Sequence, residues 1–303
     1  MLRRALLLWV AMVASLPALL AVSSTKLGLQ FADEAFIDSR LPTISGCFGR
    51  DENGRDNPWS QDLCTFGPRM ANRRLLMVGD STVASMTDGV VSAATSAGVN
   101  VVSFPSRGCT FTSRFPHSYS WCEEYFKNAI GLIASVQPDG LIVSNYLSRM
   151  DLSDRRIPFS NGRLPQSRWS RLESTILALN EALKSARNVL PEMPILIVQE
   201  VPTVPFRRPS LLFNKVNSPQ VSKYSRGFMR QREYISAVEG VASAFKNVST
   251  IDPEKVFCGN SYCSAKNADG EWLYMDSYHL NPRGSNLLTS EFKSWITKHV
   301  LAS

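Results

Sequence analysis

The chain of 303 residues lacks several features that mark common functional classes. No run of lysine and arginine with interleaved aromatics occurs, and the basic residues are spread along the sequence, which disfavours a nucleic-acid-binding protein. No internal repeat and no low-complexity tract is present, and 44% of the residues are hydrophobic, as expected of a folded protein. This length permits one large α/β domain or two smaller ones. The formal charge of +7 suits an anionic partner, such as an acidic glycan or a membrane surface.

Histidine is scarce, and no cysteines stand in a Cys-x-x-Cys pair. Only His117 lies near the middle cysteines, and it lacks a partner at the spacing of zinc ligands, so a zinc site is the disfavoured alternative. The six cysteines are expected to form disulfides, because an even number is typical of proteins in an oxidising compartment. Among the fifteen possible sets of pairs, we prefer the one that closes three short loops: Cys47 with Cys64, Cys109 with Cys122, and Cys258 with Cys263.

The longest apolar stretch lies at the N-terminus. Arg3 and Arg4 precede residues 5–25, which carry no charge and are mostly leucine, alanine and valine. Residues 1–25 are therefore expected to be an export signal, either a cleaved signal peptide or an uncleaved membrane anchor. Since the two arginines stay on the cytoplasmic side, the rest of the chain is expected to be delivered outward.

Residues 26–73 are polar and irregular, with glycines and prolines that break any periodicity. We expect an extended segment that wraps around the body of the protein and is held there by the Cys47–Cys64 bridge. A solvated loop is the default interpretation of its asparagines and arginines, and lining a substrate groove is the alternative.

From residue 74 onward, short apolar runs alternate with helical periods, which is typical of a parallel sheet with helices on both faces. Five strands are expected, at residues 75–78, 99–103, 141–144, 195–199 and 248–252. Helices are expected at residues 81–97, 123–136, 169–190, 228–245 and 285–300, with Trp169 on the apolar side of the third and Ser285 capping the last.

Two long insertions, at residues 150–166 and 202–226, follow the carboxyl ends of strands, where open α/β sheets bind ligands. The second is rich in cations, and we consider Arg207, Arg208 and Arg226 candidate ligands for an anionic glycan or phosphate, as well as Lys215 and Lys223. A solvated loop is an equally good interpretation of these charges.

An apolar run at residues 75–78 ends in Gly79-Asp80-Ser81, where a helical pattern begins. A strand followed at once by a turn and a helix places a hydroxyl above the sheet edge, beside the free N–H groups of the helix N-terminus. We therefore interpret Ser81 as a nucleophile. The alternative is a simple helix cap, because Gly-Asp-Ser alone is a common tripeptide.

Asp276 and His279 stand three residues apart shortly before the last predicted helix. In a turn, this spacing lets the carboxylate bind one ring nitrogen while the other nitrogen faces a nucleophile. Histidine, with an unperturbed pKa of about 6.5, is suited to take the proton of Ser81. Of the other histidines, His299 is expected to be solvated in the terminal helix. The sequence thus predicts a catalytic triad of Ser81, Asp276 and His279.

Acyl transfer also needs hydrogen-bond donors for the oxyanion that develops on the carbonyl. The candidates are the backbone N–H groups of Ser81 and Gly108 and the side-chain amide of Asn145. All three follow strand ends, and a parallel sheet gathers such positions at one edge.

These residues, in this order, resemble the four blocks of the SGNH, or GDSL-type, hydrolase superfamily over most of residues 74–300. More narrowly, Phe257-Cys258, Cys263 and the stretch at residues 273–280 are similar to the SGNH domain attached to bacterial membrane O-acyltransferases of acyltransferase family 3. The resemblance implies that residues 74–303 form an SGNH catalytic domain. Its expected fold is a flavodoxin-like three-layer α/β/α sandwich with a mainly parallel five-stranded sheet, and its chemistry needs no cofactor or metal.

The expected function is that of an exported, membrane-tethered O-acyltransferase that passes an acetyl group through Ser81 to a glycan of the envelope. Because the relatives carry a many-helix membrane domain and this chain has at most one span, the donor is expected to come from a separate multi-span membrane acyltransferase. One alternative is an esterase with the same triad, acting on acetylated carbohydrate or on lipid. A non-catalytic, glycan-binding accessory protein is the other.

Overall fold

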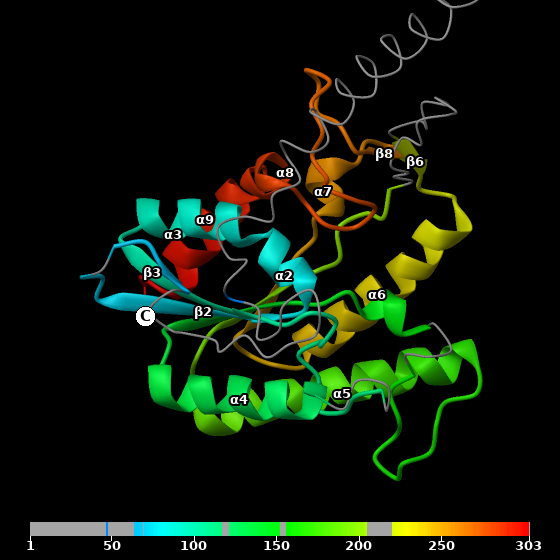
Figure 1. Cartoon of the computed structure of the whole chain (residues 1–303), viewed down its shortest axis with the longest axis horizontal. Helices are drawn as coiled ribbons and strands as arrows, with labels where there is room; N and C mark the ends of the chain where they lie inside the picture. Colours follow the sequence, from blue (N-terminus) through cyan, green and yellow to red (C-terminus); the bar gives the residue numbers. More distant parts are fainter. Residues whose placement is uncertain are drawn as a thin grey trace, which may run out of the picture.

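The computed structural model describes residues 47, 64–68, 70–116, 121–151, 156–204 and 220–302 (Figure 1). Several predicted features lie outside these residues: the N-terminal export signal, most of the wrapping segment, His117, Arg207, Arg208 and Lys215. Within the described ranges, the helices are all too short or too polar to cross a membrane.

A six-stranded sheet forms the centre of the protein, in the order β1-β3-β2-β4-β5-β7. Its strands are β1 (Thr65–Phe66), β2 (Arg73–Gly79), β3 (Val99–Pro105), β4 (Gly140–Ser144), β5 (Ile195–Val198) and β7 (Val248–Ile251). Five of them are parallel and correspond to the five predicted strands, which are thereby confirmed. The sixth, β1, pairs antiparallel with β3 and was not predicted, because two residues are too short to show a pattern.

The two faces of the sheet bury separate hydrophobic cores, because successive side chains of a strand point to opposite sides. Leu75 and Met77 of β2 belong to one core, and Leu76 and Val78 belong to the other. Helices α3 (Thr87–Ser96) and α9 (Thr289–His299) cover the first face, and α4 (Trp121–Val136), α5 (Arg168–Val189) and α6 (Arg226–Ser243) cover the second (Figure 1). The predicted three-layer α/β/α sandwich is confirmed.

Two of the predicted helices are each divided into two. The first becomes α2 (Ser81–Ser85) and α3, with a break at Met86, and the last becomes α8 (Pro282–Asn286) and α9. Asn281, not Ser285, caps α8 by accepting a hydrogen bond from Gly284. Ser285 is buried, and its Oγ accepts a hydrogen bond of 2.8 Å from the backbone N–H of Gly89 in α3. Trp169 is also not where it was expected, because it is 64% exposed at the start of α5.

The remaining elements are short: η3 (Leu147–Asp151), α7 (Glu254–Phe257) and a two-stranded sheet of β6 (Gln220–Ser222) and β8 (Tyr262–Ser264). All three predicted disulfides are present, so the pairing inferred from spacing is confirmed.

Candidate active site

Ser81 is the first residue of α2, directly after the central strand β2. Asp80 caps the helix, with its Oδ1 accepting hydrogen bonds from the backbone N–H of Thr82 (2.8 Å) and from the Thr82 hydroxyl (2.6 Å). A residue at the first helical position has no acceptor within its helix, so the N–H of Ser81 stays available to a ligand. The hydroxyl and a free N–H donor thus come from the same residue.

Gly79 lets strands β2 and β4 approach closely just before Ser81. Its φ of +144° is unfavourable for other residues, and a Cβ atom here would lie 1.9 Å from the carbonyl oxygen of Ser144. Only glycine fits, and this close approach sets Asp80 and Ser81 beside Asn145, which follows β4.

The structure brings the three residues of the predicted triad together. His279 Nε2 lies 2.7 Å from Ser81 Oγ, although the two residues are 198 positions apart, and His279 Nδ1 lies 2.6 Å from Asp276 Oδ2. The other carboxylate oxygen of Asp276 accepts hydrogen bonds from the backbone N–H groups of Tyr278 (2.9 Å) and His279 (2.8 Å). This arrangement fixes the ring so that Nε2 faces the serine hydroxyl.

Asp276 is held in its charged form. Burial alone would raise the pKa of this carboxyl, but the hydrogen bond and the positive charge of His279, together with the two backbone N–H groups, lower the pKa below its usual value. A charged Asp276 stabilises the imidazolium that forms when His279 accepts a proton.

The turn that carries Asp276 and His279 is anchored at its base. Met275 donates a backbone hydrogen bond of 2.9 Å to the carbonyl oxygen of His279, and Val204, beyond β5, donates one of 2.8 Å to that of Ser277. Gly284 of α8 packs so closely beneath the turn that a Cβ atom would lie 2.1 Å from the Leu273 carbonyl oxygen. Close packing of α8 therefore fixes the height of the turn above the sheet edge.

The oxyanion candidates lie in segments tied to the same edge. Ser106 donates a backbone hydrogen bond of 2.9 Å to the Gly79 carbonyl oxygen, and Phe111 donates one of 2.8 Å to Oδ1 of Asn145. Gly108, with a φ of +73°, lies between these two attachments. Within the described part of the chain, neither the Gly108 N–H nor the Asn145 amide nitrogen has a protein acceptor, so both are free to bind an oxyanion.

Three residues beside the histidine were not predicted. The Tyr278 ring lies 4.2 Å from the His279 ring and stacks on Tyr146 at 4.9 Å. Arg149 of η3 donates a hydrogen bond of 2.9 Å to the Tyr278 hydroxyl, and its guanidinium also lies over the ring. Tyr278 stands inside the predicted Asp276–His279 turn, which was a usable signal, but nothing near Arg149 in the sequence indicates this contact.

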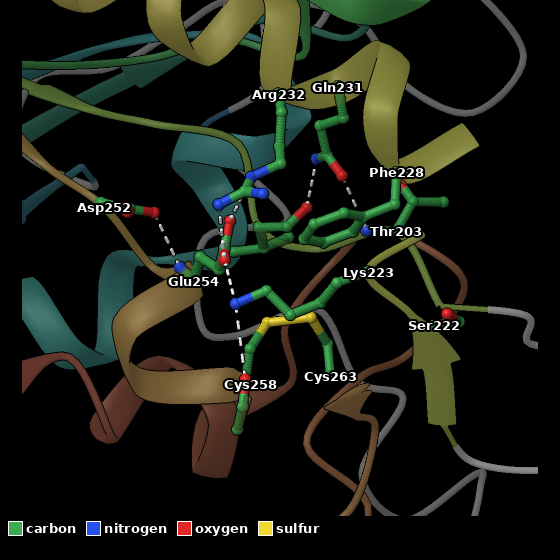
Figure 2. Close-up of a disulfide and its surroundings, with 12 residues drawn as sticks. Thr203, Ser222, Lys223, Phe228, Gln231, Arg232, Asp252, Glu254, Cys258 and Cys263 are labelled. Carbon is green, nitrogen blue, oxygen red and sulfur yellow. Dashed lines mark hydrogen bonds and ion pairs between the residues drawn. A yellow bond between two sulfur atoms is a disulfide. The ribbon is translucent and has the colours of Figure 1, made fainter. Parts of the chain in front are cut away.

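Of the five cations named in the second insertion, the structure describes Lys223 and Arg226. Arg226 is exposed at the start of α6. Lys223 instead forms an ion pair of 2.5 Å with Glu254, which also binds Arg232 of α6 at 3.2 Å, next to the Cys258–Cys263 disulfide (Figure 2). Lys223 thus links the residues directly after β6 to α7, and its binding of an anionic ligand stays a prediction.

A metal site is not evident in the described ranges, where histidine, cysteine, aspartate and glutamate form no group of three suited to an ion.

Comparison with known proteins identifies a family and similar folds. The family described as "SGNH domain (fused to AT3 domains)" matches residues 46–294. Among solved structures, the chain is similar to the periplasmic domain of a lipopolysaccharide acetyltransferase from Salmonella ser. Paratyphi A, with 15% identity, a TM-score of 0.54, and coverage of 74% of this chain and 84% of that one. It is also similar to a carbohydrate esterase of family 3 from Talaromyces cellulolyticus, with 13% identity, a TM-score of 0.47, and coverage of 76% and 99%. A search of curated proteins finds no match.

Proposed function

Since the chain belongs to the family of SGNH domains that are fused to AT3 domains, and is an enzyme of the serine acyltransferase or esterase type, we propose that it is an exported O-acetyltransferase acting on a glycan hydroxyl. The observation that carries the proposal is the pair of hydrogen-bond distances at His279, 2.7 Å to Ser81 and 2.6 Å to Asp276.

In the first half of the reaction, His279 Nε2 takes the proton of the Ser81 hydroxyl as Oγ attacks the carbonyl carbon of the acyl donor. The N–H groups of Ser81 and Gly108 and the amide of Asn145 stabilise the negative oxygen of the tetrahedral intermediate. The donor's leaving group then departs with the proton from His279, and Ser81 is left acylated.

In the second half, a sugar hydroxyl takes the place of the leaving group. His279 removes its proton, the sugar oxygen attacks the acyl carbon, and the bond to Ser81 Oγ breaks as the proton returns to the serine. The enzyme is regenerated and the glycan carries a new ester. Asp276 keeps the ring in the same tautomer throughout.

The donor and the location belong to the same proposal. The family's fusion to AT3 domains supports a separate multi-span membrane acyltransferase as the source of acyl groups. The three disulfides and the fold shared with a periplasmic acetyltransferase domain support a site outside the cytoplasm, with residues 1–25 as export signal or tether. Arg207, Arg208 and Arg226 remain candidates for binding an anionic part of the glycan.

The test is the Ser81→Ala variant, assayed by mass spectrometry for acetyl transfer from p-nitrophenyl acetate to an added oligosaccharide. Transfer is expected to fall by at least about 10³-fold with unchanged thermal unfolding, since the nucleophile is removed. Ser96→Ala is the matched control, because Ser96 lies in α3 and bonds only within its own helix. Wild-type transfer by the Ser81→Ala variant would refute the mechanism.

An esterase with the same residues is the second candidate. The Asp276 side chain is 42% exposed, so water reaches the immediate surroundings of the histidine and competes with a sugar for the acyl-enzyme. The ratio of released acetate to acetylated oligosaccharide separates the two. Acetate release without transfer at saturating acceptor would favour the esterase.

A further inference from the structure

The short segment that follows β4 carries Asn145 and lies between two buried carboxylates. Asp80 follows β2 and Glu200 follows β5, and these are the two strands that flank β4 in the sheet. Asp80 is 4% exposed and Glu200 is 6% exposed. Buried carboxylates are costly unless they are hydrogen-bonded, so their partners indicate what they are for.

Both carboxylates bind backbone N–H groups of this segment. Asp80 Oδ2 accepts a hydrogen bond of 2.8 Å from Tyr146, directly after Asn145. Glu200 Oε1 accepts one of 2.7 Å from the N–H of Ser148, and its Oε2 accepts one of 2.6 Å from the Ser148 hydroxyl. Hydrogen bonds to carboxylates are the strong ones, so the segment is fixed from both sides.

The Asn145 amide is oriented by a separate contact. Its Oδ1 accepts the hydrogen bond from the Phe111 N–H, so the amide nitrogen points away from that partner. The side chain is 5% exposed, and rotation would break this bond. The position of the amide nitrogen therefore depends on where the backbone of the segment is held.

We propose that Asp80 and Glu200 form a carboxylate clamp, and that Glu200 acts through Ser148 as a positioning residue for the Asn145 oxyanion donor. This inference rests on the proposed function. Asp80 also orients the Ser81 helix, so its removal would disturb the nucleophile. Glu200 contacts this segment at its far end, through Ser148, and also bonds the Gln231 side chain of α6. The clamp is best tested at Glu200.

Burial raises the pKa of Glu200 to about 7, and the negative charge of Asp80 contributes to the shift. The clamp holds in both protonation states, because each leaves one carboxyl oxygen as acceptor for the Ser148 N–H.

The first experiment measures hydrolysis of p-nitrophenyl acetate, which needs the oxyanion donors but no glycan. Glu200→Ala is expected to lower kcat about 10-fold to 100-fold with little change in KM, since misplacing one donor acts on the transition state. Glu200→Gln is expected to restore most of the rate, because its amide oxygen still accepts from Ser148. The matched control is Asp139→Ala, which removes a carboxylate bound to Arg73 and the Arg74 N–H at the opposite edge of the sheet.

The second experiment separates positioning from general loss of structure. In an Asn145→Ala background, Glu200→Ala is expected to cause no further loss of kcat, because the donor that it positions is already gone. If Glu200→Ala does not fold, Ser148→Ala serves instead, since it removes only the hydroxyl bond, and a loss of about 2-fold to 5-fold is expected.

Two results would overturn the clamp: a wild-type kcat in Glu200→Ala, or multiplicative losses in the double variant. Failure of the proposed function looks different. If the wild type hydrolyses the ester but never acetylates a glycan, transferase activity is refuted while the clamp is still measurable. If Ser81→Ala retains the hydrolysis, the proposed mechanism itself is refuted.

Discussion

At the scale of single residues, Tyr278 packs against the imidazole ring of His279. Its ring lies against His279 and is held by Tyr146 and Arg149. Tyr278→Ala is expected to lower kcat/KM about 10-fold, because the imidazole loses a contact surface that restricts it. Tyr278→Phe keeps the ring and loses only the hydroxyl bond to Arg149, so a change of less than about 3-fold is expected. Ester hydrolysis measures both, and equal losses in the two variants would contradict a packing role.

Glu200 makes the stability of the protein depend on pH. Its pKa rises from 4.5 to about 7 on folding because burial favours the neutral form, so the native state binds the proton more tightly than the unfolded chain. The contribution of Glu200 to the free energy of unfolding is therefore fully present below pH 4.5. It is lost as the pH rises towards about 7, and the loss is up to about 3 kcal/mol.

Urea unfolding of the wild type and of Glu200→Gln across this pH range checks the sign. The variant lacks the ionisable group, so its stability relative to the wild type is expected to increase from pH 4.5 to pH 7 and then to level off. A constant difference between the two proteins would show that folding does not raise the pKa of Glu200.

Residues with a local signature could be predicted, and residues defined by sheet order could not. Ser81 lies in a short Gly-Asp-Ser motif, and Asp276 and His279 lie three residues apart. These local patterns indicate a nucleophile and its base. Glu200 and Arg149 have no such motif, since their partners depend on which strands lie side by side. The ion pair of Lys223 could not be predicted for the same reason, because its partner Glu254 lies on a separate element.

At the scale of elements, glycines set how closely α3 and α8 approach. A Cβ atom on Gly89 would lie 2.2 Å from the Ser285 carbonyl oxygen, and the Gly89 N–H also donates to Ser285 Oγ. Gly89→Ala is therefore expected to lower the free energy of unfolding by about 2–3 kcal/mol, as overpacking does. It should also lower ester hydrolysis, because α8 supports the turn of His279.

Gly131→Ala is the matched comparison for this prediction. Gly131 lies in α4 with no atom within 4 Å of the position where Cβ would be, so alanine there is expected to stabilise the protein by about 0.5–1 kcal/mol through helix propensity. If close packing requires glycine at position 89, urea unfolding will show a lower free energy of unfolding for Gly89→Ala and a higher one for Gly131→Ala. Two equal effects would contradict this interpretation.

The boundaries of helices are less evident from the sequence than their presence. The apolar spacing after Ser81 runs on without interruption, so one helix was expected where α2 and α3 are separated at Met86. Likewise, Ser285 looked like a cap, whereas it is buried against Gly89. The second difference arises from the contact between α3 and α8, which no local pattern contains.

At the scale of the whole molecule, the fold class followed from the alternation of apolar runs and helical periods, because that alternation leaves few ways to bury the sheet. The register of the parallel strands then brings residues from four strand ends to one edge. The disulfides followed from short spacing. The antiparallel strand β1 could not be predicted from the sequence, because its two residues are extended through their pairing with β3.

The Cys109–Cys122 disulfide is expected to affect both stability and activity, because Cys109 follows Gly108 and Cys122 lies in α4. Replacing both cysteines by alanine is expected to lower the free energy of unfolding by about 3 kcal/mol, from the entropy of the loop, and to lower kcat several-fold. Replacing Cys258 and Cys263, which enclose a shorter loop, is expected to cost about 2 kcal/mol. Urea unfolding and ester hydrolysis are measured for both double variants. An unchanged kcat without the Cys109–Cys122 disulfide would contradict a role of this disulfide in positioning the Gly108 N–H.

The short strand β1 has a consequence for aggregation. It occupies the outer edge of β3, whose seven residues are all buried and mostly apolar. Unpaired, such an edge offers its N–H and C=O groups to any other extended chain. Cys64, which is bonded to Cys47, immediately precedes β1 and accepts a hydrogen bond from the Ser103 N–H at this edge. The Cys47–Cys64 bond is therefore expected to keep β1 in place and to protect this edge from pairing between copies, an effect on solubility and not on catalysis.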